Sequence, residues 1–268
     1  MADCRLREAV RFLRFGAAFL KTLFVAACLL VPGALSSQAS ECNRYAIEIT
    51  TSPVIYQWTS ALEKASNLLA ATPSQAETIL LGDSLLAFWP HDLAETQFGK
   101  GSVWNFAVGG SRTQHILWQL DKLGATKPSP SEVVVLIGTN NLTDEKLPPC
   151  AIVAGIEAVV GKVHETWPGA IVHVMGIPPR GSDFHFRDDA RKAINDEVRR
   201  WIATLERTRY FEVDAMRMTC GRYGEAKGTL DLTPDGPKNR CENYADDFGH
   251  FKRPGYEVIY SALRDEIN

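Results

Sequence analysis

The sequence lacks internal repeats, low-complexity tracts and the composition of a disordered or fibrous chain. Hydrophobic residues make up 45% of its 268 positions, so the chain has enough apolar side chains for a sizeable core. The apolar run at residues 22–31 is shorter than the roughly 18 to 20 residues that a membrane-spanning helix needs. These absences favour one large globular domain after removal of any export signal.

Metal-binding cysteine patterns are also missing. The chain has six cysteines, but no CxxC pair and no paired His/Cys spacing, so a zinc site has no support. Two of the six fall in the first 39 residues. The even number that remains is compatible with disulfides in an exported protein, although four cysteines allow three pairings. We predict that Cys220 pairs with Cys241, around one irregular stretch, and Cys42 with Cys150.

The first 39 residues have the layout of a secretory signal. Four arginines precede the apolar run 22–31, and a small-residue stretch, 36–39, follows it. We predict cleavage after Ala39, which leaves residues 40–268 as a single exported domain, periplasmic or secreted. Residues 25–28 also resemble a lipoprotein signal box that ends at Cys28. The apolar run continues beyond that cysteine, which makes lipid attachment the less favoured outcome.

The charge balance of the remaining chain excludes two classes of partner. Removal of residues 1–39 takes away five basic and two acidic residues, so the formal net charge changes from −3 to −6. A chain with this balance has no general attraction to nucleic acid or to an anionic membrane. We therefore expect no nucleic-acid partner, and no stable membrane insertion once the signal is removed.

Strand-like apolar runs alternate with helical segments along the mature chain. The strand candidates are residues 79–81, 103–106, 133–137, 171–175 and 210–213. Amphipathic helical spacing occurs at residues 55–69, 116–123, 152–167, 190–205 and 255–268. This alternation predicts right-handed βαβ units, and hence an α/β fold with a five-stranded parallel sheet covered by helices on both faces.

A serine stands where the first of these strands turns into a helix. The apolar run 79–81 leads directly into Gly82, Asp83 and Ser84. Ser84 has two interpretations from these residues alone. It is either an N-cap that satisfies a backbone N–H, or a nucleophile at the carboxyl edge of the sheet, where open α/β folds bind ligands. The second interpretation requires a base and an oxyanion pocket elsewhere in the chain.

Polar groups at other strand ends and near the end of the chain supply candidates for the base and for the oxyanion pocket. Adjacent glycines, Gly109 and Gly110, follow the second strand and let the backbone approach a ligand. The turn after the third strand carries the amides Asn140 and Asn141. Near the end of the chain, Asp247 stands three residues before His250. Across that spacing a carboxylate can fold back to accept the imidazole Nδ1–H, which leaves Nε2 free to take a proton.

Other residues are weaker candidates. His185, in the loop after the fourth strand, is the nearest competitor for the base and a possible substrate contact. His173 lies within an apolar strand, and His115 falls in an amphipathic helix, where we expect a solvated face. Phe88 and Trp89 follow Ser84 closely enough to line an acyl pocket, although such aromatics more often fill a core.

Four blocks of sequence together resemble the SGNH (GDSL-type) hydrolase superfamily, over residues 77–268. The blocks are Gly82-Asp83-Ser84-Leu85, residues 105–110, Gly138-Thr139-Asn140-Asn141 and residues 247–250. The resemblance implies a flavodoxin-like three-layer α/β/α fold and a serine hydrolase that cleaves esters without a metal or other cofactor. One departure is Asn141, where the family commonly has Asp. We expect this substitution to alter loop support more than chemistry.

The resemblance also implies a role for each matching residue. Ser84 corresponds to the nucleophile, His250 to the general base and acid, and Asp247 to the group that orients His250. The backbone N–H groups of Ser84 and Gly110, together with the Asn140 side chain, correspond to the oxyanion hole.

We therefore predict an exported serine esterase that removes short acyl groups from a carbohydrate or another polar alcohol. The preference for a polar alcohol rests on export and on polar and aromatic residues of a long loop, 214–247, namely Arg217, Arg222, Tyr223, Lys227 and Arg240. A lipase or lysophospholipase, or an acyltransferase with the same residues, remains open. A non-catalytic carbohydrate-binding protein is the alternative from another class, but such a protein has no need for a complete Ser, His and Asp set.

Overall fold

A five-stranded parallel sheet organises the computed structural model, which describes residues 42–223, 231–233, 236–238 and 241–267. The strand order is β2-β1-β3-β4-β5. The strands are β1 (Thr78–Gly82), β2 (Val103–Asn105), β3 (Glu132–Leu136), β4 (Ile171–Met175) and β5 (Thr208–Phe211). All five lie within two residues of the predicted positions, and the α/β prediction is confirmed. The predicted signal segment, with Ala39 and Cys28, lies outside the described residues, as do Lys227 and Arg240.

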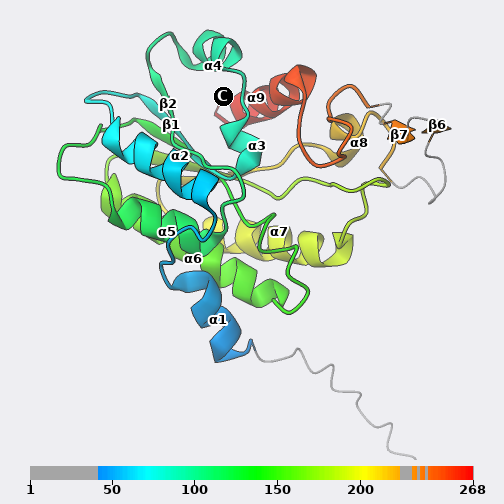
Figure 1. Ribbon diagram of the computed structural model, residues 1–268, viewed down its shortest axis with the longest axis horizontal. Helices are drawn as coiled ribbons and strands as arrows, with labels where there is room; N and C mark the ends of the chain where they lie inside the picture. Colours follow the sequence, from blue (N-terminus) through cyan, green and yellow to red (C-terminus); the bar gives the residue numbers. More distant parts are fainter. Residues whose placement is uncertain (1–41, 224–230, 234–235, 239–240, 268) are drawn as a thin grey trace, which may run out of the picture. The chain divides into compact units, whose positions relative to one another are not determined.

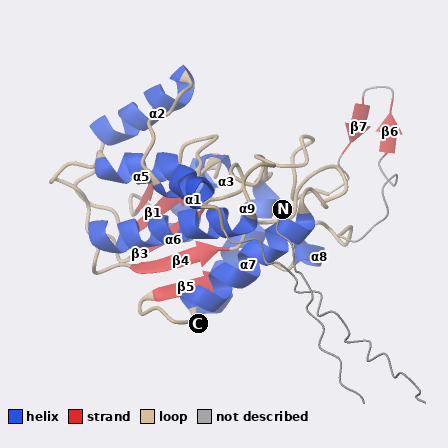
Figure 2. Cartoon of the chain, turned by 90° about the horizontal axis from the view of Figure 1, so that it is seen from below, coloured by secondary structure: helices blue, strands red, loops and turns tan. Residues whose placement is uncertain are grey.

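Helices cover both faces of this sheet (Figures 1 and 2). They are α1 (Arg44–Thr51), α2 (Thr59–Ala70), α3 (Ser84–Ala87), α4 (His91–Phe98), α5 (Thr113–Asp121), α6 (Pro149–Thr166), α7 (Asp188–Ile202), α8 (Ala215–Met218) and α9 (Arg253–Ile267). A short antiparallel hairpin, β6 (Asp231–Thr233) with β7 (Gly236–Lys238), lies apart from the sheet. No helix within the described ranges is long and apolar enough to cross a membrane.

Successive strand residues point to opposite faces, and both faces are apolar. Ile79 and Val133 belong to the hydrophobic cluster that includes α6 and α7. Leu80 and Val134 belong to the second cluster, which includes α9. A parallel strand in a sheet that helices cover on both faces is buried on both sides and is therefore mostly apolar, which explains the apolar runs in the sequence. The predicted three-layer arrangement follows from this double burial.

The strand order brings polar loops together at one edge. Because β2 and β3 lie on opposite sides of β1, their connections diverge at its carboxyl end, which is where open α/β sheets bind ligands. Gly82 ends β1 in close contact with β3, since an added Cβ would lie 2.0 Å from the Leu136 carbonyl oxygen. A glycine is therefore required just before Asp83 and Ser84.

The amino-terminal helix differs from the prediction. The helical spacing at 55–69 predicts one helix, but α2 begins at Thr59, after Trp58 in an extended conformation (ψ 134°). Ile55 and Trp58 are 48% and 38% exposed. The backbone N–H of Val54 bonds instead to the Gln114 carbonyl, at 3.0 Å, so this segment is held as a loop on α5.

Both predicted disulfides are confirmed. Cys42 pairs with Cys150, with 5.9 Å between the Cα atoms, and ties the start of α1 to α6. Cys220 pairs with Cys241, with 5.3 Å between the Cα atoms. The second bond joins Cys220, just after the end of α8, to the segment that precedes Asp247 and His250.

Candidate active site

Ser84 is the first residue of α3, immediately after the carboxyl end of β1. Asp83 caps this short helix, because its Oδ1 accepts the backbone N–H of Leu85 at 2.9 Å. Ser84 itself is therefore not the N-cap, which removes the structural interpretation that the sequence left open. Its side chain is free to hydrogen-bond elsewhere.

Asp247 and His250 belong to a tight turn close to Ser84. The Asp247 Oδ1 accepts the backbone N–H groups of Gly249 and His250, at 3.0 and 2.9 Å. The chain reverses at Phe248, which has a left-handed φ of 56°. This conformation is unfavourable for a residue with a Cβ, but the Phe248 side chain is buried in return.

The three side chains form a continuous hydrogen-bonded chain. His250 Nε2 lies 2.8 Å from the Ser84 hydroxyl oxygen, and His250 Nδ1 lies 2.5 Å from Asp247 Oδ2. Partial burial on its own raises the pKa of Asp247, but hydrogen bonds from the His250 ring and from two backbone N–H groups outweigh it and lower the pKa to about 2. The carboxylate is thus ionised at neutral pH and holds the imidazole with Nε2 toward Ser84.

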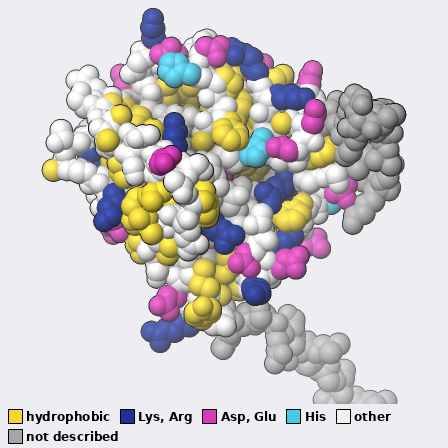
Figure 3. Space-filling view, viewed as in Figure 1, with side chains coloured by type: hydrophobic (Ala, Val, Ile, Leu, Met, Phe, Trp, Pro, Cys, Tyr) yellow, Lys and Arg dark blue, Asp and Glu magenta, His cyan; other side chains and the backbone are white. Residues whose placement is uncertain are grey.

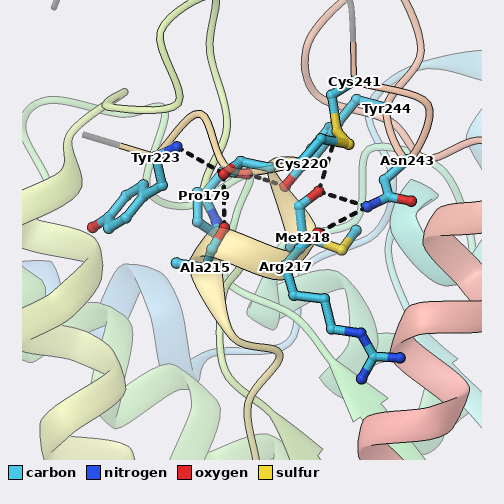
Figure 4. The surroundings of a disulfide bond; sticks show 10 residues. Pro179, Ala215, Arg217, Met218, Cys220, Tyr223, Cys241, Asn243 and Tyr244 are labelled. Carbon is cyan, nitrogen blue, oxygen red and sulfur yellow. Dashed lines mark hydrogen bonds between the residues drawn. A yellow bond between two sulfur atoms is a disulfide. The ribbon is translucent and has the colours of Figure 1, made fainter. Parts of the chain in front are cut away.

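The segment before this turn is anchored on both sides (Figure 4). The Asn243 side chain donates to the carbonyls of Arg217 and Met218, at 3.1 and 3.0 Å, beside the Cys220–Cys241 disulfide. The buried Tyr244 hydroxyl donates to the Pro179 carbonyl at 2.5 Å. Backbone hydrogen bonds from Ala245 N–H to the His250 carbonyl and from Gly181 N–H to the Phe248 carbonyl complete the support. His250 is therefore carried on a fixed loop.

Backbone donors are available beside the Ser84 hydroxyl. Within the described part of the chain, neither the Ser84 N–H nor the Gly110 N–H has a hydrogen-bond acceptor. A Cβ built on Gly109 would lie 3.8 Å from the Ser84 Cβ, so the glycine loop contacts the serine directly. The Asn140 side chain donates from Nδ2 to the Ser111 carbonyl at 3.0 Å, which fixes its amide on the same loop. Its second N–H remains for a ligand.

Two further amides support these loops. Asn105 donates to the Leu86 carbonyl at 2.8 Å and ties the end of β2 to α3. Asn141 is fully buried, and its Oδ1 accepts the backbone N–H of Thr113 at 3.0 Å while its Nδ2 donates to Gln114 at 3.1 Å. The residue that departs from the family pattern therefore fills its amide capacity with α5, as expected for loop support.

The two aromatic residues after α3 separate in the structure. Trp89 is buried and donates to the Gln97 side chain at 2.9 Å, so it belongs to the core. Phe88 is 56% exposed, and its ring centroid lies 5.0 Å from that of His250. Of the pair, only Phe88 borders the space beside Ser84.

The other histidines have structural surroundings. His173 is buried in β4, and neither ring nitrogen has a partner among the described residues; burial lowers its pKa to about 4. His185 stacks on Tyr223. The prediction of a solvated face for His115 was wrong: the ring is buried, stacks on Tyr56 and accepts the backbone N–H of Arg112. Helical spacing could not reveal the α1–α2 connection that covers it.

Asp83 is a residue whose importance sequence reasoning missed. Its side chain is completely buried, and its Oδ2 has no partner among the described residues. Burial raises the pKa of Asp83 to about 7, against the opposing influence of the Leu85 N–H and the Arg180 charge. The only signal in the sequence was its position directly before Ser84.

Comparison with known proteins identifies the class of this site. The profile of the GDSL-like Lipase/Acylhydrolase family matches residues 74–258. The human platelet-activating factor acetylhydrolase IB subunit alpha1 is 32% identical over 192 residues, which cover 70% of this chain and 74% of the relative. The chain therefore belongs to the GDSL-like lipase/acylhydrolase family, within the SGNH hydrolase superfamily, and is an ester-hydrolysing enzyme.

Other relatives agree with this assignment. The rat alpha2 subunit of the same acetylhydrolase is 24% identical over 75% of this chain and 80% of the relative. A GDSL-like lipase from Bacteroides thetaiotaomicron superposes with a TM-score of 0.56 at 13% identity, over 76% of this chain and 96% of that one. The superposition confirms the fold.

Substitution of Asp83 by Asn tests the buried carboxyl. Because the pKa of Asp83 is raised on folding, the folded chain keeps a proton between about pH 4 and 7 that the unfolded chain releases, so this group's contribution to stability falls as pH rises through that window. Asn stays neutral and can still accept the Leu85 N–H. The stability of D83N relative to the parent should therefore rise between pH 5 and pH 8, by about 2 to 3 kcal/mol.

The free energy of unfolding, measured with a chemical denaturant at pH 5 and at pH 8, tests this prediction. Asp265→Asn, on an exposed position of α9, serves as the control for loss of one surface carboxylate. A difference between parent and D83N that is the same at both pH values would contradict a raised pKa.

Proposed function

We propose that this chain is an exported serine esterase that removes short acyl groups from a polar alcohol through an acyl-enzyme on Ser84. The observation that carries the proposal is the chain of hydrogen bonds from Ser84 through His250 to Asp247. A serine hydroxyl is a weak nucleophile at neutral pH and needs such a base. A carbohydrate-binding protein would have no use for it.

Acylation begins when Ser84 Oγ attacks the ester carbonyl carbon and its proton passes to His250 Nε2. The resulting imidazolium is stabilised by the ionised Asp247. When the tetrahedral intermediate collapses, the bond between the carbonyl carbon and the alcohol oxygen breaks, and His250 gives its proton to the departing alcohol. A water molecule then attacks the acyl-enzyme, loses a proton to His250 and releases the acid, and Ser84 recovers its proton.

The oxyanion formed in each half-reaction would lie among three donors. These are the free N–H groups of Ser84 and Gly110 and the remaining N–H of the Asn140 side chain. Donors fixed before the reaction stabilise developing charge without reorganisation. The bond from Asn140 to the Ser111 carbonyl supports this role, because it fixes the direction of the amide.

Two observations support a short acyl group. The human relative is an acetylhydrolase by name. The exposed Phe88 ring also lies beside the His250 ring, where it could form one wall of a short acyl pocket. The same relative acts on platelet-activating factor by name, so an acetylated lipid is the second candidate substrate.

The long loop gives less support for a polar alcohol than the sequence indicated. The Tyr223 hydroxyl donates to Asp188 at 2.7 Å and accepts from Arg191 at 3.0 Å. Arg217 lines a cavity of about 710 Å³ along β5 whose lining includes neither Ser84 nor His250. Tyr223 and Arg217 therefore do not carry a polar-alcohol preference.

Export is supported by the two disulfides, since such bonds persist in oxidising compartments. We propose that residues 1–39 are a signal that is removed, so that residues 40–268 function as one periplasmic or secreted domain.

Hydrolysis of p-nitrophenyl esters by the purified protein tests the proposed function. We expect p-nitrophenyl acetate to be cleaved with a higher kcat/KM than the octanoate, because a short acyl group would fit against Phe88 better than a long one. Ser84→Ala should retain the fold and lose at least about three orders of magnitude in kcat, as expected when the nucleophile is removed. Equal cleavage by S84A would exclude the acyl-enzyme, and a preference for octanoate would exclude a short-acyl pocket.

Asn140→Ala tests the oxyanion hole separately. Loss of one such donor typically costs about 2.7 to 4 kcal/mol of transition-state stabilisation, or roughly two to three orders of magnitude in kcat. We expect that loss with an unchanged circular dichroism spectrum. Asn141→Ala is the matched control, because it removes the neighbouring amide that supports α5, and its larger effect should be on stability. Turnover by N140A within a few-fold of the parent would remove Asn140 from this role.

A further inference from the structure

A second hollow lies beside the glycine loop of the active site. It has a volume of about 470 Å³, which is within the range of small-molecule sites. We call it the Trp58 groove. The residues that matter here are Tyr45, Glu48, Gln57, Trp58, Arg112 and His115. They come from α1, from the connection between α1 and α2, and from the start of α5. Hydrophobic side chains gather over the N-terminal end of α2 and the connection before it (Figure 3).

Two adjacent glycines join this groove to the nucleophile. A Cβ built on Gly109 would lie 3.8 Å from the Ser84 Cβ, whereas one on Gly110 would lie 3.0 Å from Cζ2 of the Trp58 indole. Consecutive Cα atoms are about 3.8 Å apart, so the indole and the serine flank a single dipeptide. The lining of the groove does not itself include Ser84. A molecule whose carbonyl lies at Ser84 would have to cross only Gly110 to reach the Trp58 indole.

The groove combines exposed aromatic rings with polar side chains that can form hydrogen bonds to a ligand. Trp58 and Tyr45 are 38% and 69% exposed, so neither ring is part of the core. The Arg112 guanidinium approaches Asp144 only to 3.8 Å, which is longer than a hydrogen bond. The Glu48 carboxylate adds an acceptor, and the exposed Gln57 amide adds both a donor and an acceptor.

We propose that the Trp58 groove binds the sugar ring of an O-acylated carbohydrate, so that the ring carrying the ester is the leaving alcohol. This inference rests on the proposed function and names its substrate class. A sugar presents C–H groups on the faces of its ring and hydroxyls around its edge, which match aromatic side chains flanked by a carboxylate, an amide and a guanidinium. A lipid chain in the same groove would desolvate those polar groups without replacing their hydrogen bonds, which is costly.

The test compares three substrates in parent, W58A, W58F and Y45A. The substrates are an acetylated xylo-oligosaccharide, p-nitrophenyl acetate and an acetylated phosphocholine lipid, and the readout is kcat/KM for release of acetate or nitrophenol. Because an aromatic anchor is typically worth more than 1 kcal/mol, W58A should lower the ratio of oligosaccharide to p-nitrophenyl acetate about tenfold. Y45A should lower that ratio less, and W58F, which keeps a ring, should restore most of it.

The outcomes separate this inference from the proposed function. If the parent cleaves p-nitrophenyl acetate but no acetylated oligosaccharide, or if both W58A and Y45A leave the ratio unchanged, the sugar site is overturned and the esterase stands. A selective loss of lipid cleavage in W58A would assign the groove to a lipid instead. Failure of the parent on every ester would overturn the proposed function itself.

Discussion

The hydrogen bond between the Ser84 hydroxyl and the His250 ring joins residues 166 positions apart in the chain. It exists only because both ends are fixed independently. At one end, β1 stops at Gly82 against β3, and Asp83 caps α3 so that the next residue faces the site. At the other end, the Cys220–Cys241 disulfide and the buried Tyr244 hold the segment before the turn. Most of the chain between them builds the sheet that keeps these two ends in register.

Different residues surround this bond on its two sides. Asp247 contacts the His250 ring, and the glycine loop lies beside Ser84. Asp247, ionised and hydrogen-bonded on both oxygens, fixes the imidazole. Gly109 lies against Ser84 and Gly110 against Trp58, so the residue whose N–H we propose for the oxyanion hole also packs against the indole. If the Trp58 groove binds the leaving alcohol as we propose, substrate selection takes place next to the reacting atoms. Phe88 lies beside the imidazole of His250.

The parts of the fold that follow from local pattern could be predicted from the sequence. Five apolar runs marked the strands, the turn after residues 79–81 marked Ser84, and spacing marked the Asp247 and His250 pair. The features that could not be predicted from the sequence depend on contacts between distant segments. The sequence contains no signal for the left-handed conformation of Phe248, whose cost is offset by burial of its ring. His115 is buried by a connection whose position on α5 no periodicity encodes.

Covalent trapping tests the central claim most directly. A fluorophosphonate reacts much faster with an activated serine than with other side chains, so intact-protein and peptide mass spectrometry should find one dominant adduct, on Ser84, in the parent enzyme. His250→Ala should fold, since that side chain is partly exposed, and should label at least about a hundredfold more slowly, the scale of a lost general base. Labelling of another residue, or an undiminished rate in H250A, would contradict activation of Ser84 by His250.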